Sequence, residues 1–94
     1  MKALLIKADG TAPENVELEN FAAIKKSIGG GHVCIAEINP STEEDFDMLC
    51  CDEDGLAKEL PFNLKATNKA NWPYPVVGDV VICRSADFFA ITND

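Results

Sequence analysis

The chain has 94 residues and lacks any long hydrophobic run. No apolar stretch approaches the roughly 20 residues that a membrane-spanning helix needs. The opening residues 1–10, MKALLIKADG, also lack a signal-peptide core, because Lys7 and Asp9 interrupt the apolar stretch before about 7 to 15 residues accumulate. We therefore expect no membrane association, no secretory signal and a location in the cytoplasm.

Basic residues are scarce in this chain. Eight Lys and Arg stand against sixteen Asp and Glu, for a formal net charge of -8 and a pI of about 4.4. Such a surface repels phosphate backbones, so we expect no direct binding of nucleic acid. A strongly acidic protein is suited to a basic surface on another protein, including one that normally grips DNA, although solubility alone also explains the charge.

Histidine is nearly absent, and this limits the chemistry. Nucleophilic catalysis needs a base beside the nucleophile and a third group that orients the base. His32 is the only histidine, and it follows three glycines at the start of an expected strand, where we expect it to be exposed. The sequence therefore predicts no catalytic residue, and we do not expect an enzyme.

The four cysteines do not have the spacing of a metal site. His32 and Cys34 would share one face of a strand, and Cys50 or Cys51 would add a third ligand. Structural zinc sites, however, draw paired ligands from tight knuckles, and adjacent strand residues point in opposite directions. The DEDG stretch lacks the closing glutamate of a calcium loop. We expect no metal and no cofactor, with reduced thiols and with Cys34, Cys50 and Cys83 as small core residues.

Length and composition predict one globular domain over residues 1–94. Hydrophobic residues make up 47% of the chain and charged residues 26%, and the mean hydropathy is -0.03. These values are typical of a folded protein, but a chain of this length is near the size at which stability becomes marginal. We expect a monomer or a small homo-oligomer.

Hydrophobic spacing predicts a strand, a helix and two further strands in the first half of the chain. The strand is expected over residues 2–8, before the turn signal Asp9-Gly10. The helix has apolar residues at spacings of three and four and should end at glycines in left-handed conformations. These residues are Leu18, Phe21, Ile24 and Ile28, followed by Gly29, Gly30 and Gly31. Residues 32–39 and 44–51 should pair as an antiparallel hairpin.

The second half is expected to hold a short helix and one strand. Asp52 to Gly55 reads as a turn, and a weaker helix follows from about residue 56 to 70, which Pro61 either breaks or starts afresh. We favour a fresh start, with residues 62–69 helical. Residues 77–85 form the last expected strand, and residues 85–94 a partly frayed tail.

This element order predicts an α+β fold. Strand, helix, strand, strand, helix, strand is the βαββαβ order of ferredoxin-like folds, with an antiparallel sheet and here a short second helix. The alternative is a rearranged α+β sheet with only one long helix.

Four motifs form an ordered string along the chain: IGGG before a strand, then DEDG, LPFNLKAT and VGDVVI. The string resembles that of a family of small uncharacterised domains that recur in bacteriophages and mobile elements, and the likeness spans about residues 16 to 85. The stretch NWPYP fills a segment that is expected to vary, and the adjacent Cys50 and Cys51 depart from the family pattern. The resemblance implies a phage or prophage accessory protein that acts inside a bacterium, and it brings no activity with it. The matching positions are Gly30, Asp52, Gly55, Asn63, Ala66, Thr67, Gly78 and Asp79.

An acidic run provides the candidate binding surface. Its carboxylates are Glu43, Glu44, Asp45, Asp47, Asp52 and Asp54. They form either a docking surface for a basic partner or a solvated hairpin edge whose charge discourages aggregation.

Asn63 and Thr67 form a second candidate site. Asn63 is placed to cap the short helix that follows it, and a buried Asn63 beside Thr67 could also read the polar edge of a small ligand. From these features we predict a phage or mobile-element accessory protein that binds a basic host protein without catalysis, including in an anti-defence role. The alternative is a protein that sequesters a small nucleotide-like ligand.

Overall fold

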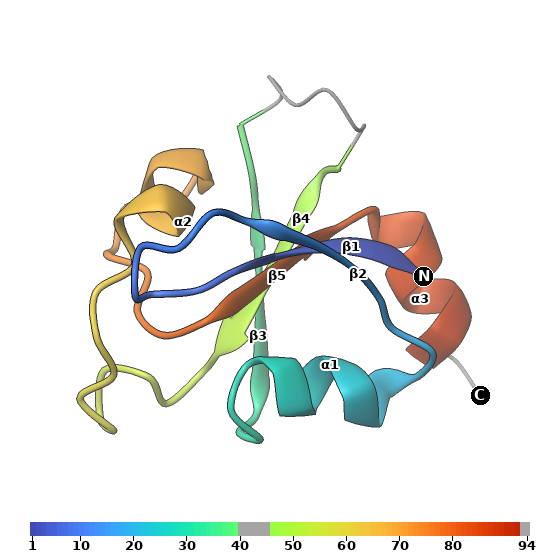
Figure 1. Ribbon diagram of the computed structural model, residues 1–94, viewed down its shortest axis with the longest axis horizontal. Helices are drawn as coiled ribbons and strands as arrows, with labels where there is room; N and C mark the ends of the chain where they lie inside the picture. The colour runs from blue at the N-terminus through green and yellow to red at the C-terminus, as the bar shows by residue number, and fades with distance from the viewer. Residues whose placement is uncertain (40–45, 93–94) are drawn as a thin grey trace.

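The computed structural model describes residues 1–39 and 46–92 and shows an α+β domain in which helices cover both faces of one sheet (Figure 1). Its strands are β1 (Lys2–Ile6), β2 (Glu14–Glu17), β3 (Val33–Glu37), β4 (Met48–Asp52) and β5 (Val80–Cys83), and its helices are α1 (Phe21–Ser27), α2 (Leu64–Lys69) and α3 (Ser85–Thr92). All neighbouring strands are antiparallel, in the order β2-β1-β5-β4-β3. No helix in the described part of the chain is long and apolar enough to cross a membrane.

The hydrophobic core has two layers, one on each face of the sheet. The first layer lies under α2 and contains Ile6, Ala36, Ile38, Phe46, Leu49, Ala66, Ala70, Val76, Val80 and Ile82. The second lies under α1 and α3 and contains Ala3, Leu18, Ile24, Ile28, Met48, Cys50, Val81, Cys83 and Phe88. Alternate residues of one strand enter opposite layers, as strand geometry requires.

β4 is an interior strand and not the exposed edge that the acidic run suggested. It pairs with β5 on one side and β3 on the other, and Met48, Leu49 and Cys50 are all buried. Because both faces of β4 are covered, its sequence is a continuous apolar run without polar alternation. The predicted antiparallel pairing of the two strands is confirmed, since Cys34 lies opposite Cys51 and Ile35 opposite Cys50.

The predicted ferredoxin-like strand order is wrong. In that order the third strand of the pattern lies beside the first, whereas here β4 contacts β5 and β3, and β5 lies beside β1. The reason is the extra strand β2, which forms a hairpin with β1 and occupies one of its two sides. Only one side of β1 remains, and β5 takes it.

Two elements differ from the prediction because their sequence signals are weak. β2 has the sequence ENVE and is largely exposed, so it carries no hydrophobic alternation that would indicate a strand. The supposed tail is helical over Ser85–Thr92, and Phe88 anchors it in the second core layer. Sequence reasoning missed α3 because the contact that fixes its first turn comes from Asp47, far away in the chain.

Candidate functional site: an open strand edge beside a network of motif residues

Asn63 is a buried structural cap. Its side chain is 1% exposed, its Oδ1 accepts a hydrogen bond from the Ala66 N–H at 3.1 Å, and it is the N-cap of α2. Its Nδ2 donates to the carbonyls of Ile6 and Gly78, both at 2.9 Å. One amide therefore ties α2 to β1 and to the turn before β5, so the predicted capping role is confirmed.

Thr67 and Asp79 extend this network. The Thr67 hydroxyl donates to the Asn63 carbonyl at 2.8 Å and accepts from the Val76 N–H at 2.9 Å. Asp79 Oδ1 accepts from the Ala8 N–H at 2.9 Å, which ties the end of β1 to the start of β5. These contacts give both motif positions a structural role.

Asp52 is buried and closes the turn after β4 with an ion pair to the half-exposed Lys58. Lys58 Nζ lies 2.7 Å from Asp52 Oδ2, and the Asp54 N–H donates to Oδ1 at 2.9 Å. Burial acts to raise the pKa of Asp52, but the bonds from Lys58 and Asp54 outweigh it and hold the pKa below its ordinary value. Gly31 allows this pair to form, because a Cβ there would lie 2.6 Å from Asp52 Oδ1 and Lys58 Nζ.

The glycines serve two different purposes. Gly29 and Gly30 adopt positive φ angles of 105° and 88° and end α1, as predicted. Gly31 was also expected to be left-handed, but its φ is not positive, and neither is that of Gly55. A Cβ on Gly55 would lie 2.7 Å from Val77 Cγ2, so the turn needs glycine there for close approach.

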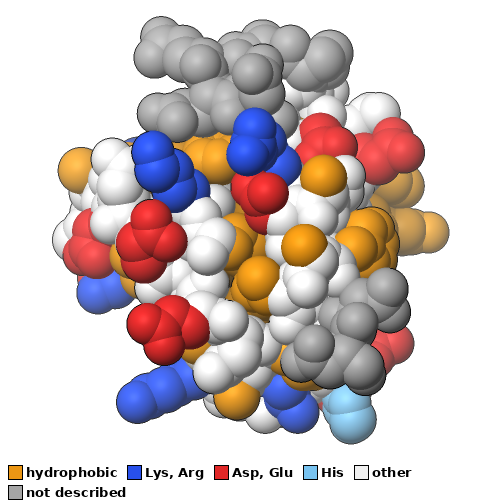
Figure 2. Space-filling model, turned by 90° about the vertical axis from the view of Figure 1, so that its right-hand side faces the viewer, with side chains coloured by type: hydrophobic (Ala, Val, Ile, Leu, Met, Phe, Trp, Pro, Cys, Tyr) orange, Lys and Arg blue, Asp and Glu red, His pale blue; other side chains and the backbone are white. Residues whose placement is uncertain are grey.

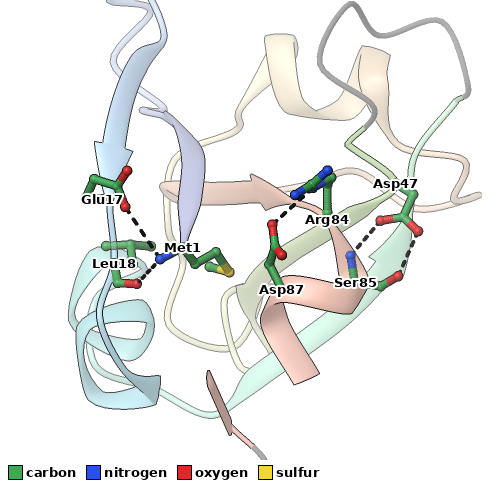
Figure 3. Close-up of polar contacts among 7 residues, drawn as sticks. All are labelled: Met1, Glu17, Leu18, Asp47, Arg84, Ser85 and Asp87. Atoms are coloured by element: carbon green, nitrogen blue, oxygen red, sulfur yellow. Dashed lines mark hydrogen bonds and ion pairs between the residues drawn. The ribbon is translucent and has the colours of Figure 1, made fainter. Parts of the chain in front are cut away.

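Several aspartates have a structural role in the fold. Asp9, Asp47, Asp52 and Asp79 all accept hydrogen bonds from backbone N–H groups and so hold turns and helix starts in place. Figure 3 shows the Asp47 carboxylate, which accepts hydrogen bonds from Ser85, and the Arg84–Asp87 ion pair beside it. It also shows the Met1 nitrogen, which donates to the Leu18 carbonyl and lies near Glu17.

The predicted docking acids do not form one described surface. Glu43, Glu44 and Asp45 lie outside the described residues. Asp47 binds Ser85, Asp52 is 6% exposed and pairs with Lys58, and Asp54 is exposed in the turn that follows. Among the described acids of this set, only Asp54 therefore has a carboxylate that faces solvent and accepts no structural hydrogen bond.

Cys50 and Cys83 are core thiols as predicted, whereas Cys34 was predicted in the core and is only partly buried, as is Cys51. All four are free, and Cys50 and Cys83 are buried. A hydrogen bond with Cys83, together with burial, raises the pKa of Cys50, and burial raises the pKa of Cys51 to about 12. The described residues contain no group of three His, Cys, Asp or Glu side chains placed to hold a metal ion, and His32 is exposed.

The two edges of the sheet have opposite character. β2 is short and places Glu14 and Glu17 at one edge, which is a usual protection against pairing with another strand. β3 has the sequence VCIAE at the other edge, and its Ile35 side chain is 43% exposed. The only charged residue of β3 is Glu37 at its end, and an apolar stretch such as Val33–Ala36 at a sheet edge is a template for an additional strand.

The backbone of β3 is open over its first half. The His32 carbonyl accepts from Glu53 of the neighbouring chain segment, whereas the Glu37 carbonyl points the other way and accepts from Asn71 at 2.8 Å. Because the N–H and carbonyl groups of successive strand residues point to opposite sides, the backbone groups of Val33 and Ile35 point away from β4, as those of Glu37 do. Within the described residues, β3 pairs with β4 alone, and the contacts of Lys69–Asn71 close only its far end.

Hollows lie on both sides of this edge. One, of about 420 Å³, is lined by Ile35 and Glu37 of β3 and by Phe89 of α3, which is 53% exposed. Figure 2 looks onto the side of the molecule that carries α3, and hydrophobic side chains gather across the middle and right of that view. The other, of about 150 Å³, is lined by Cys34 and Cys51 and by Leu56, Trp72 and Tyr74.

Sequence reasoning did not find this site. NWPYP carries no predicted site residue, although it supplies Trp72 and Tyr74 to the smaller hollow. The only available signal was the apolar character of VCIA together with exposed aromatic residues between prolines. That signal has no meaning until β3 is known to be an edge strand.

These features define a small α+β domain with a five-stranded antiparallel sheet, and the described part of the chain contributes three helices to it. The chain belongs to the family described as a domain of unknown function (DUF3846), whose family model matches residues 1–94. Comparison with curated proteins and with solved structures finds no match.

Proposed function

We propose that this chain is a non-enzymatic binding protein that takes an extended segment of a basic host protein by strand addition to β3. The observation that carries the proposal is the contrast between the edges, since β2 has acids at both of its ends, whereas the first half of β3 is apolar and its outward backbone groups are open. In strand addition the main-chain hydrogen bonds provide affinity, and pockets for alternate side chains provide specificity. Val33 and Ile35 offer the main-chain groups, and the two hollows offer the pockets.

Charge supports a basic partner. The chain carries a net charge of -8, and the exposed side chains of Glu37 and Glu53 lie at the two sides of the β3 edge. Such a field attracts a cationic segment and speeds its association. A second copy of this chain carries the same charge and is repelled, so we assign the edge to a different protein.

The biological setting rests on the motif string of the chain. Its resemblance to domains of bacteriophages and mobile elements supports an accessory protein that works in the cytoplasm of a bacterial host, including against a host defence protein. The alternative function, sequestration of a nucleotide-like ligand, gains no support from the geometry. The hydrogen-bonding groups of Asn63 and Thr67 are engaged within the fold.

Hydrogen exchange with a defined peptide tests strand addition. The probe is a short capped peptide in which lysine alternates with valine about a central phenylalanine. We expect it to slow exchange of the Val33 and Ile35 amides, and to bind more weakly as salt rises from about 0.1 M to about 1 M. Unchanged exchange at both amides under saturating peptide would refute the proposal.

A proline variant separates backbone pairing from side-chain contact. Ile35→Pro removes one outward N–H, which an edge strand tolerates when that group faces solvent. We expect this variant to fold but to lose the peptide, whereas Ile35→Thr keeps the N–H and retains binding. Equal peptide binding by a folded Ile35→Pro variant would contradict pairing at this residue.

A further inference from the structure

The smaller hollow beside β3 has the build of a side-chain pocket. Cys34 and Cys51 lie opposite each other on β3 and β4 and form its floor. Leu56 and Tyr74, which are 64% and 61% exposed, stand at its rim with Trp72. Exposed large apolar side chains that converge on a cavity mark a contact surface and are not a feature of ordinary solvated loops.

The aromatic wall is held in place before any partner arrives. The Trp72 and Tyr74 rings meet edge to face, with centroids 5.8 Å apart and an interplanar angle of 71°. Pro73 and Pro75 fix the backbone on either side of Tyr74. The segment is tied at one end by the Asn71 N–H to the Glu37 carbonyl and at the other by Val76 to Thr67 and Asn63. A pre-organised pocket loses little conformational entropy on binding.

We infer that this hollow is the anchor pocket for one large apolar side chain of the added strand, namely the residue that lies opposite Cys34. The inference rests on strand addition as proposed above. Side chains of an added strand alternate between the faces, so the residue beside Cys34 shares its face and meets this hollow. Its two neighbours then lie opposite Val33 and Ile35, and the residue three positions away lies opposite Glu37.

The size and charge of the hollow select the side chain. Its volume is about 150 Å³, and an apolar cavity of about that size accommodates a benzene ring. The described lining includes Glu53 and no Lys or Arg, and the Asp52 carboxylate is already paired with Lys58, so an acidic side chain is disfavoured. The pocket therefore takes phenylalanine, leucine or a similar side chain, and a lysine three positions away lies opposite Glu37.

Trp72 makes the test direct, because it is the only tryptophan in the chain. The lysine–valine peptide is prepared with phenylalanine, alanine or aspartate at its centre, and its affinity and the Trp72 emission are measured. We expect phenylalanine to bind about 10-fold or more tightly than alanine, as burial of an aromatic ring implies, and to shift the Trp72 emission. Aspartate should bind weakest.

Surface variants show whether the pocket carries this preference. Tyr74→Ser and Leu56→Ser should reduce the advantage of phenylalanine over alanine, while Leu64→Ser, which alters a similarly exposed apolar residue on α2, should not. If the peptides slow hydrogen exchange at the Val33 and Ile35 amides, but the phenylalanine and alanine peptides bind with equal affinity, the anchor pocket is refuted and strand addition stands. If no peptide binds, both are refuted.

Discussion

Both carboxylate oxygens of Asp47 hold Ser85, although 38 residues separate the two in the chain. Oδ1 accepts from the Ser85 N–H and Oδ2 from its hydroxyl, each at 2.7 Å (Figure 3). An acceptor at this place satisfies an amide of the first turn of α3 that has no partner within the helix. The contact turns a residue of the acidic run into a helix cap supplied from another part of the fold.

Asp47→Ala should therefore destabilise the protein by about 0.5 to 1 kcal/mol at pH 7, as the loss of a solvent-exposed cap. Hydrogen bonds from the Ser85 N–H and hydroxyl lower the pKa of Asp47 below 3.8, so its contribution is complete above that pH and disappears as the pH falls through the lowered value. Urea unfolding at several pH values measures this. Asp54→Ala serves as a matched control, and an equal loss in that variant would contradict the capping role.

Lys58→Met should leave Asp52 as a buried charge without its cation. We expect a loss of roughly 1–2 kcal/mol at pH 7, less than for a fully buried pair because the Lys58 side chain is 44% exposed. The pKa of Asp52 is lowered in the native protein, so the stabilisation exists above its ordinary value of 3.8 and fades as the pH falls through the lowered one. Thermal melts of both proteins should converge in acid, and a pH-independent difference would argue against the ion pair.

Gly55→Val should destabilise the turn by about 1–3 kcal/mol, because the new Cβ would lie 2.7 Å from Val77 Cγ2. The cause is crowding and not backbone strain, so Gly55→Ala should also destabilise. Combining Gly55→Ala with Val77→Ala should recover part of the loss beyond the sum of the single changes, as a double-mutant cycle would measure. Purely additive effects would exclude this contact as the cause.

Asn63→Ala should cost roughly 2–4 kcal/mol, more than an ordinary cap, since it also leaves the buried Ile6 and Gly78 carbonyls without a donor. Asn63→Asp keeps the acceptor for Ala66 but cannot donate to the two carbonyls. Chemical denaturation should place Asn63→Asp well below the native protein in stability. A native-like midpoint for Asn63→Asp would show that the cap alone matters.

Charge reversal of Glu43, Glu44 and Asp45 to lysine tests the acidic docking prediction. These residues lie outside the described part of the chain, and the prediction follows from their charge. We expect the triple variant to bind the lysine–valine peptide several-fold more weakly at about 0.1 M salt and to approach the native affinity at about 1 M. Unaltered affinity at low salt would restrict the charge effect to acids elsewhere.

The sequence predicted correctly those features of the fold that depend only on adjacent residues. The α1 glycines, the Asn63 cap and the Asp52 turn were all predicted, because helix ends and tight turns are governed by a few adjacent residues. The pairing of β3 with β4 was also predicted, from two apolar runs separated by a short polar connection. The candidate acids were read less well, because the sequence does not distinguish a solvated carboxylate from one that caps a distant helix.

By itself, then, the sequence determined the class of the domain, most of its strands, the end of α1 and the position of α2, but it placed Leu18 in a helix that begins only at Phe21. Tertiary structure decided which strand lies at the edge. The sequence ENVE does not look like a strand, yet it pairs with β1 and forms one edge of the sheet, which leaves β5 on the other side of β1, while β3 is outermost at the opposite edge. The aromatic pocket beside β3 exists only in the folded chain, because it brings together Cys34, Leu56, Trp72 and Tyr74 from three separate segments.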